Sequence, residues 1–139
     1  MATTTAQLTL SSDLLSNNVT LTTSTTCMKA GTTADGLDQM DMGYIEVATG
    51  TNFDLLDAEN SLTKDKANKV YICNDSTDET YYVVVTIDAT VVGRLYGGDW
   101  MFIPWGAEDA TADIEIQEYT GTNKISYMFF HEGRTLGSA

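Results

Sequence analysis

The stretch YYVVVTIDATVVGRLYGGDWMFIPW, residues Tyr81 to Trp105, decides the predicted fold. β-Branched and aromatic residues fill it, and two turn-forming pairs, Asp88-Ala89 and Gly97-Gly98, divide it into three apolar segments. Such residues favour pleated strands, and a Gly-Gly pair suits the positive φ angles that tight hairpins need. The stretch therefore predicts a three-stranded antiparallel meander.

Two-residue loops at both turns would assign each side chain of the meander to a face. One face would carry two cross-strand rows, and we expect it to pack into the core: Tyr82, Leu95 and Trp100, then Val84, Gly93 and Phe102. Pro104, opposite Val91, would end the pairing, as a proline at a strand end should. The other face is largely apolar and needs a cover, either the Thr-rich N-terminal strands or a neighbouring subunit. We expect both to contribute, with an assembly interface formed by these residues: Val83, Val85, Val92, Arg94, Tyr96, Met101, Ile103 and, after the strand, Trp105.

The rest of the chain extends the β pattern in both directions. Strands are predicted at 7–15, 19–28, 44–49, 69–74, 81–87, 90–96, 99–105, 112–119 and 124–131, and 53–62 is open between a short strand and a helical turn. Short strands with turn signals between them are typical of sandwiches and barrels. We therefore expect an all-β fold: one antiparallel β-sandwich domain over 1–139, jelly-roll-like, with a meander in its C-terminal half. Residues 28–43 are predicted to form a long loop, and 1–7 and 132–139 extended arms.

The charge balance restricts the partners. Seven basic residues against twenty acidic ones give a net charge of −13, which disfavours a nucleic-acid partner because phosphates are bound by Lys and Arg. The sequence has no apolar run long enough to cross a membrane and no secretory signal. Other proteins, and further copies of this chain, are the expected partners.

Few residues suggest chemistry. The one histidine, His131, could join Ser126 or Ser138 in a catalytic arrangement, but no nucleophile motif accompanies it. The acidic pairs Asp78-Glu79 and Glu108-Asp109 are better read as solvated loop residues than as paired catalytic carboxylates. Cys27 and Cys73 fall in strand-like segments, where we expect free thiols and not a disulfide. We therefore expect no catalytic residues, no bound cofactor and no enzyme.

Two weaker ligand hypotheses remain open. Asp35, Asp38 and Asp41 recur every third residue in a Gly-containing segment, which could gather oxygen ligands around calcium, although the EF-hand order is absent. The aromatic residues between Tyr81 and Trp105 could also form a platform on which a sugar stacks, although aromatic residues in strands are more often part of a core.

The order of several short motifs resembles that of small virion proteins of tailed bacteriophages, marine phages included. The motifs are Ile72-Cys73-Asn74 at a strand end, Leu95-Tyr96-Gly97-Gly98-Asp99 at a turn, Pro104-Trp105 after a strand, and Tyr127-Met128-Phe129-Phe130 in the last strand. The resemblance covers about Lys69 to His131. It implies a non-enzymatic structural protein of the virion, made in the host cytoplasm and bound to capsid or other virion proteins.

Within that resemblance, a capsid decoration or cement protein that stabilises the head shell is the leading hypothesis. A tail, neck or fibre component is the first alternative, and a module that binds carbohydrate or the host surface is the second.

Overall fold

The computed structural model describes residues 4–13, 19–31, 36–37, 39–47, 52–58, 67–106, 112–118 and 121–131. Ten strands account for most of them. They are β1 (Thr4–Ser12), β2 (Val19–Cys27), β3 (Gln39–Val47), β4 (Asn52–Leu56), β5 (Asn68–Asn74), β6 (Tyr82–Ile87), β7 (Thr90–Tyr96), β8 (Trp100–Pro104), β9 (Ile114–Glu118) and β10 (Asn123–His131).

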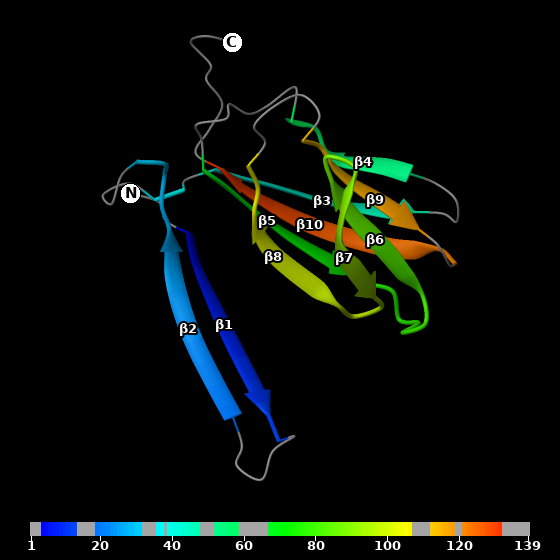
Figure 1. Ribbon diagram of the computed structural model, residues 1–139, viewed down its shortest axis with the longest axis horizontal. Helices are drawn as coiled ribbons and strands as arrows, with labels where there is room; N and C mark the ends of the chain where they lie inside the picture. Colours follow the sequence, from blue (N-terminus) through cyan, green and yellow to red (C-terminus); the bar gives the residue numbers. More distant parts are fainter. Residues whose placement is uncertain are drawn as a thin grey trace.

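Eight of the strands form a jelly roll. Two four-stranded antiparallel sheets have the orders β3-β10-β5-β8 and β4-β9-β6-β7, so successive strands alternate between the sheets except for the β6–β7 hairpin. This is the strand order of two interleaved Greek keys, the double-sheet jelly roll. The remaining strands, β1 and β2, form a separate hairpin that leaves the sandwich at one end and points away from it (Figure 1). The predicted all-β antiparallel sandwich is confirmed.

The core lies between the two sheets. Its completely buried members come from inward-facing positions of both: Val70, Ile72 and Ile125 from one sheet, Val83, Val85, Ile114 and Ile116 from the other. On β5 the burial alternates at every residue, as expected for a strand with one face in a core. The sandwich is therefore closed by ordinary apolar packing.

The predicted strands match the observed ones within a few residues, with three corrections at the N-terminal side. The long loop predicted over 28–43 is too long, because β3 begins at Gln39 and Met28 already forms a bridge with Gly36. The open segment 53–62 begins as a strand, β4. The N-terminal arm predicted over 1–7 is wrong from Thr4 onward, because Thr4 starts β1; the arm predicted at 132–139 lies outside the described residues.

The predicted meander is wrong at its second turn. Gly97 and Gly98 carry the chain from one sheet to the other, and β8 pairs with β5, so that Pro104 lies opposite Lys69. The Gly97 amide donates to the Tyr81 carbonyl at 3.1 Å, and the Gly98 amide donates to the Asn74 carbonyl at 2.8 Å. These glycines therefore hold the two sheets together at one end.

A buried polar contact supports this crossing. Asn74 and Asn123 are completely buried, and the Asn74 amide nitrogen lies 2.9 Å from both the Leu95 carbonyl oxygen and the Asn123 side-chain oxygen. The Asn74 side-chain oxygen accepts from the Ser76 amide at 3.0 Å. The Asn74 side chain thus connects β5 with β7, with β10 and with the turn that follows β5.

The faces assigned to β6 and β8 are reversed, whereas the faces assigned to β7 hold. A register shift between Val85 and Thr86 turns the first part of β6 over relative to β7, because a one-residue slip moves side chains to the other face. β8 lies in the other sheet, so the predicted rows do not extend to it. Five residues predicted for an open interface are inside: Val83, Val85 and Trp105 are buried, and Met101 and Ile103 pack against the core. Of the residues predicted for the core, Leu95 is there, whereas Trp100 is half exposed.

Candidate functional site

The outer face of sheet β3-β10-β5-β8 carries apolar side chains in cross-strand rows. Directly opposed residues of antiparallel strands point to the same face, and the register defines three rows. The first is Met42, Met128, Tyr71 and Phe102; the second is Met40, Phe130, Lys69 and Pro104; the third is Tyr44, Ser126, Cys73 and Trp100. We call this the methionine–aromatic face. An outward sheet face normally alternates to polar residues, so its composition points to a covered surface.

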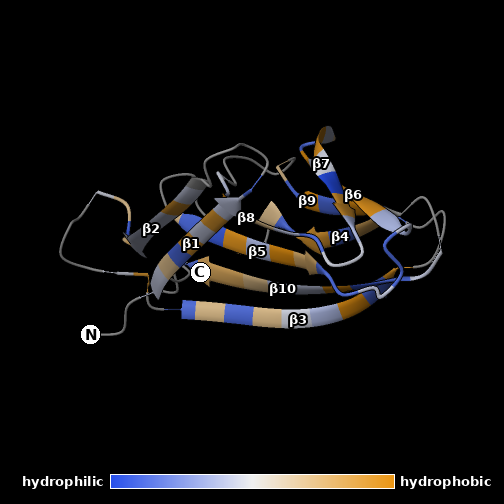
Figure 2. Ribbon diagram, turned by 90° about the horizontal axis from the view of Figure 1, so that it is seen from below, coloured by the Kyte–Doolittle hydropathy of each residue, from blue (hydrophilic) through white to orange (hydrophobic). Residues whose placement is uncertain are grey.

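The methionine–aromatic face is exposed along both edges of its sheet. On the edge strand β3, Met40, Met42 and Tyr44 are 49%, 61% and 56% exposed, and on the edge strand β8, Trp100 is 51% exposed. The hydrophobic and hydrophilic bands of β3 alternate (Figure 2), which places its methionines together on one side. Contiguous exposed apolar area of this kind marks an interaction surface.

The β1–β2 hairpin has two chemically different faces. On one face lie the pairs Thr4–Cys27, Ala6–Thr25, Leu8–Thr23 and Leu10–Leu21; on the other lie Thr5–Thr26, Gln7–Ser24, Thr9–Thr22 and Ser11–Thr20. Thr4, Ala6 and Leu8 are half-buried, whereas Thr5, Gln7 and Thr9 are exposed. The hairpin therefore turns its apolar face towards the sandwich.

A groove of about 710 Å³ separates the hairpin from the methionine–aromatic face. The first half of the hairpin forms one wall, including Ala6 and Leu8, and β5, β8 and β10 form the other, including Tyr71, Phe102 and Phe130. The hairpin is fixed at its base, where Leu37 donates its amide to the Cys27 carbonyl at 2.8 Å and both residues are buried. The groove is large enough to receive side chains of another molecule.

Two polar groups of the methionine–aromatic face are kept neutral. Burial is the main cause that raises the pKa of the Tyr71 phenol to about 12, and the neighbouring Cys73 thiol raises it further. Burial also raises the pKa of the Cys73 thiol, so the thiolate that a nucleophile needs is disfavoured. Both cysteines are free thiols, as predicted. This surface is suited to packing and not to covalent chemistry.

The predicted interface residues that remain exposed lie on the other sheet. Val92, Arg94 and Tyr96 belong to β7, and the Arg94 guanidinium stacks 4.7 Å from the centre of the Tyr82 ring. Trp105, predicted for the interface, is buried, and its indole nitrogen donates to the Ala112 carbonyl at 2.8 Å. Of the two tryptophans, Trp100 is the exposed one, and it lies 6.2 Å from Tyr71 between ring centres.

The histidine pairs with an aspartate of the neighbouring strand. His131 is buried, stacks on Phe129, and its Nε2 lies 3.1 Å from Asp41 Oδ2. Ser126, five residues earlier on β10, points to the opposite face of the sheet, because side chains alternate along a strand. Ser138, the other serine considered for a catalytic arrangement, lies outside the described residues.

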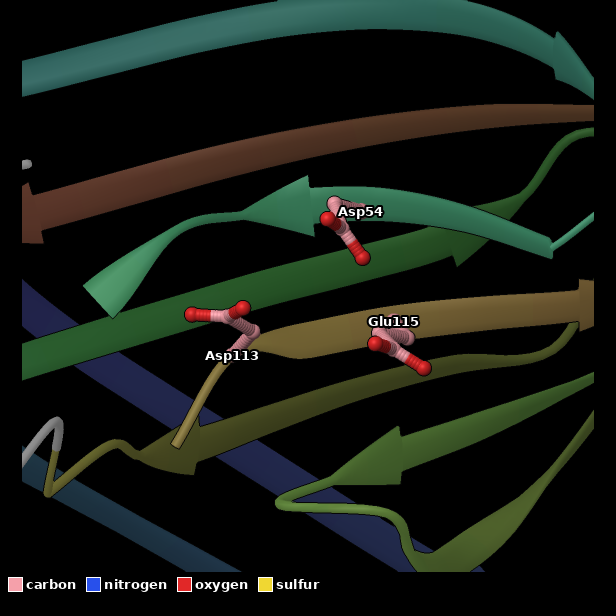
Figure 3. A group of neighbouring side chains, drawn as sticks. All are labelled: Asp54, Asp113 and Glu115. Atoms are coloured by element: carbon pink, nitrogen blue, oxygen red, sulfur yellow. The ribbon is translucent and has the colours of Figure 1, made fainter. Parts of the chain in front are cut away.

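The candidate calcium residues do not form a described cluster. Asp35 and Asp38 lie outside the described residues, and Asp41 is in β3 beside His131. A different acidic group lies on the outer face of the second sheet, where oxygen atoms of Asp54, Asp113 and Glu115 come within 4.8 Å of one another (Figure 3). Burial first, and then Asp54, raises the pKa of Glu115. Clustered carboxylates alone do not identify an ion site, because Asp113 is already used to accept the Ala58 amide at 2.8 Å.

Comparison with known proteins gives little beyond the fold. No family model matches the sequence, and no curated protein matches it. Among solved structures, the chain is similar to the cupin domain of Cnp3 from Schizosaccharomyces pombe, with 13% identity and a TM-score of 0.43, over 96% of this chain and 87% of that one. Similarity at this level identifies no function. Among the described residues, no helix is long and apolar enough to span a membrane.

Proposed function

We propose that the chain is a non-enzymatic structural protein that attaches to a larger protein assembly through its methionine–aromatic face. The resemblance of the segment from Lys69 to His131 to small phage virion proteins favours a virion as that assembly. Decoration or cementing of the head shell is the leading form of the proposal. In that role the protein would stabilise the shell by burying this face against capsid proteins.

One observation carries the proposal: this exposed face is apolar, although the chain has a net charge of −13. Lys69 is the single charged residue in the three rows of the face. Where a surface carries little charge, two acidic proteins can approach without strong repulsion. Methionine side chains also adapt to irregular partner surfaces.

The polar groups support a role without catalysis. Ser126 is on the other side of β10 from the His131–Asp41 pair, so its hydroxyl does not face that pair. The raised pKa of Cys73 keeps that thiol protonated. The wall of the groove that β5, β8 and β10 form offers apolar contact area through Tyr71, Phe102 and Phe130.

Immunogold electron microscopy tests the proposal. Virus particles from the source of the sequence are labelled with an antibody against the purified chain, and label distributed over the heads is the expected result. Label confined to tails or necks would replace the decoration role by the tail, neck or fibre alternative. Particles that carry no label, with the chain detected only in the host fraction, would overturn the proposal of a virion protein.

A carbohydrate-binding role is the second candidate, favoured by the Tyr71–Trp100 pair on the same face. Two neighbouring rings, one of them half exposed, could stack on a sugar. Glycan-array binding that Trp100→Ala abolishes would support this role. The matched control is Tyr96→Ala, which removes an exposed aromatic ring from the other sheet. Equal loss in both variants would exclude a specific site at Trp100.

A further inference from the structure

Two apolar elements of the chain are left uncovered by the fold itself. The first is the far half of the hairpin, where Leu10 and Leu21 lie opposite each other and are 52% and 49% exposed. The second is the outer side of β3, formed by Met40, Met42 and Tyr44. We call these the hairpin tip and the β3 strip. The groove under the hairpin is lined by residues of β5, β8 and β10 and includes neither element.

The hairpin cannot cover the β3 strip of its own chain while its base stays in place. Its base is held by the buried residues Cys27 and Leu37 and by the Thr4 hydroxyl, which donates to the Leu37 carbonyl at 3.3 Å. From that point the strands run away from the sandwich (Figure 1). A nine-residue strand is about 30 Å long, so the tip extends well beyond the sheet edge and is accessible to another molecule.

The absence of charged residues from the hairpin strands indicates which partner surface the tip can bind. The strands of the hairpin contain no Asp, Glu, Lys or Arg, and the first charge after β1 is Asp13. The β3 strip is also uncharged up to Glu46, which lies opposite Lys124. In a chain of net charge −13, most contacts between two copies would be repulsive. A contact between these two uncharged apolar elements avoids that repulsion and removes both from water.

We propose that the hairpin tip of one copy packs on the β3 strip of a second copy. Leu10 and Leu21 would lie against Met40, Met42 and Tyr44. The opposite face of the hairpin, which contains the pairs Thr9–Thr22 and Ser11–Thr20 and which we call the hydroxyl face, would stay in contact with water. A reciprocal pair of copies is the smallest closed assembly in which both tips and both strips are covered. This inference deepens the proposed function, because it names the occupant of one part of the methionine–aromatic face.

The main test compares two double substitutions on the same hairpin. Leu10→Glu with Leu21→Glu places two charges on the apolar face. Thr9→Glu with Thr22→Glu places the same charges on the neighbouring, directly opposed pair of the hydroxyl face. Sedimentation equilibrium of the full chain should show self-association of the wild type. We expect about a 100-fold rise in the dissociation constant for the leucine variant and less than about a threefold rise for the threonine variant.

Several outcomes would overturn the inference. A monomeric wild type at high concentration, unchanged association of the leucine variant, or equal loss in both variants would each exclude packing through the tip. Near-ultraviolet circular dichroism of the tryptophans should be the same in all three proteins, because neither pair contacts the core.

A cross-linking experiment tests the position of the contact. Leu10→Cys and Met42→Cys chains, each with Cys73→Ser, are mixed and oxidised, and a disulfide-linked pair containing one chain of each kind is expected. Thr9→Cys replaces Leu10→Cys as the control and should give no such pair. Absence of the Leu10–Met42 pair would exclude the β3 strip as the binding surface.

The outcomes also separate this inference from the proposed function. A monomeric chain that labels virions would overturn the contact between copies alone. An oligomer that follows these expectations but labels no particle would overturn the virion role alone.

Discussion

The two sheets of the sandwich have the same number of strands but opposite outer faces. Sheet β3-β10-β5-β8 carries methionines and aromatic rings outward, whereas sheet β4-β9-β6-β7 carries Asp54, Glu115, Gln117 and Arg94. Both inner faces are equally apolar, as a shared core requires. Because folding needs only the inner faces, the difference between the outer ones is evidence about partners. The polar sheet is suited to face water, and the apolar sheet is suited to face protein.

The largest effect is expected at Gly97, which joins the two sheets. A Cβ there would overlap the backbone carbonyl oxygens of Asp78 and Ser76, the second at 2.7 Å. Backbone atoms cannot move aside cheaply, so Gly97→Ala should lower the free energy of unfolding by about 3 kcal/mol or more. Chemical denaturation measures this change in the free energy of unfolding. Gly93→Ala is the control, since its Cβ would meet open space; similar losses in both variants would contradict this account of the crossing.

The second effect concerns the buried contact that stabilises the same crossing. Asn74→Ala would remove the buried donor to the Leu95 carbonyl and to the Asn123 side-chain oxygen, at a cost of about 2–3 kcal/mol. Asn52→Ala is the control, because Asn52 is exposed at the start of β4. In thermal unfolding, Asn74→Ala should lower the Tm much more than Asn52→Ala. A stable Asn74→Ala protein would show that the sheets do not depend on this contact.

The third prediction compares the outer faces directly. Met42 and Val91 are 61% and 63% exposed, and each lies on an edge strand, one of each sheet. Met42→Glu and Val91→Glu should each change the stability of the isolated chain by less than about 0.5 kcal/mol. Met42→Glu should weaken association with copies or particles at least about tenfold, because it buries a charge. Co-sedimentation checks this, and equal weakening by Val91→Glu would remove the distinction between the sheets.

The smallest effect is expected at Glu115, on the outer face of sheet β4-β9-β6-β7. The pKa of Glu115 is raised in the folded chain, so folded protein binds the proton more readily and stability falls as pH rises above the ordinary glutamate value of 4.5. Glu115→Gln should therefore raise the Tm at pH 7, by about 1–2 °C, and the gain should disappear below that value.

Glu79→Gln is the control for this substitution, because it removes one exposed negative charge from the turn before β6. An equal gain for Glu79→Gln, or a gain for Glu115→Gln that persists in acid, would contradict the assigned cause.

The sequence predicts the strands well because their signals are local. β-Branched runs bounded by Asp88-Ala89 or by Gly97-Gly98 indicate where a strand begins and ends. Which strand each one pairs with depends on residues that are distant in the sequence. A Gly-Gly turn can close a hairpin or carry the chain to another sheet, and the choice depends on β5, more than twenty residues earlier. The register shift beside Val85 is also set by packing, and it reverses the predicted face of β6 relative to β7.

The sequence does not predict the methionine–aromatic face, because its edge strand β3 begins in a segment that resembles a loop. The sequence around Met40 and Met42 contains Asp41 and Gly43, which are uncommon in strands. Asp41 pairs with His131, and Gly43 leaves room for the Tyr127 ring, which a Cβ would overlap. The alternation of Met40, Met42 and Tyr44 was the available signal. Its meaning depended on these two partners, which come from β10.

Oxidative footprinting of the methionines tests the central claim most directly. In the dissociated chain, represented by the variant with Leu10→Glu and Leu21→Glu, Met40 and Met42 should be oxidised by hydrogen peroxide much faster than Met101, which packs against the core. In the native particle the account predicts that Met40 and Met42 become at least about tenfold slower, while Arg94 and Glu115 on the other sheet stay accessible to side-chain labelling reagents. Methionines that react equally fast in the particle, with protection found on β7 and β9 instead, would contradict it.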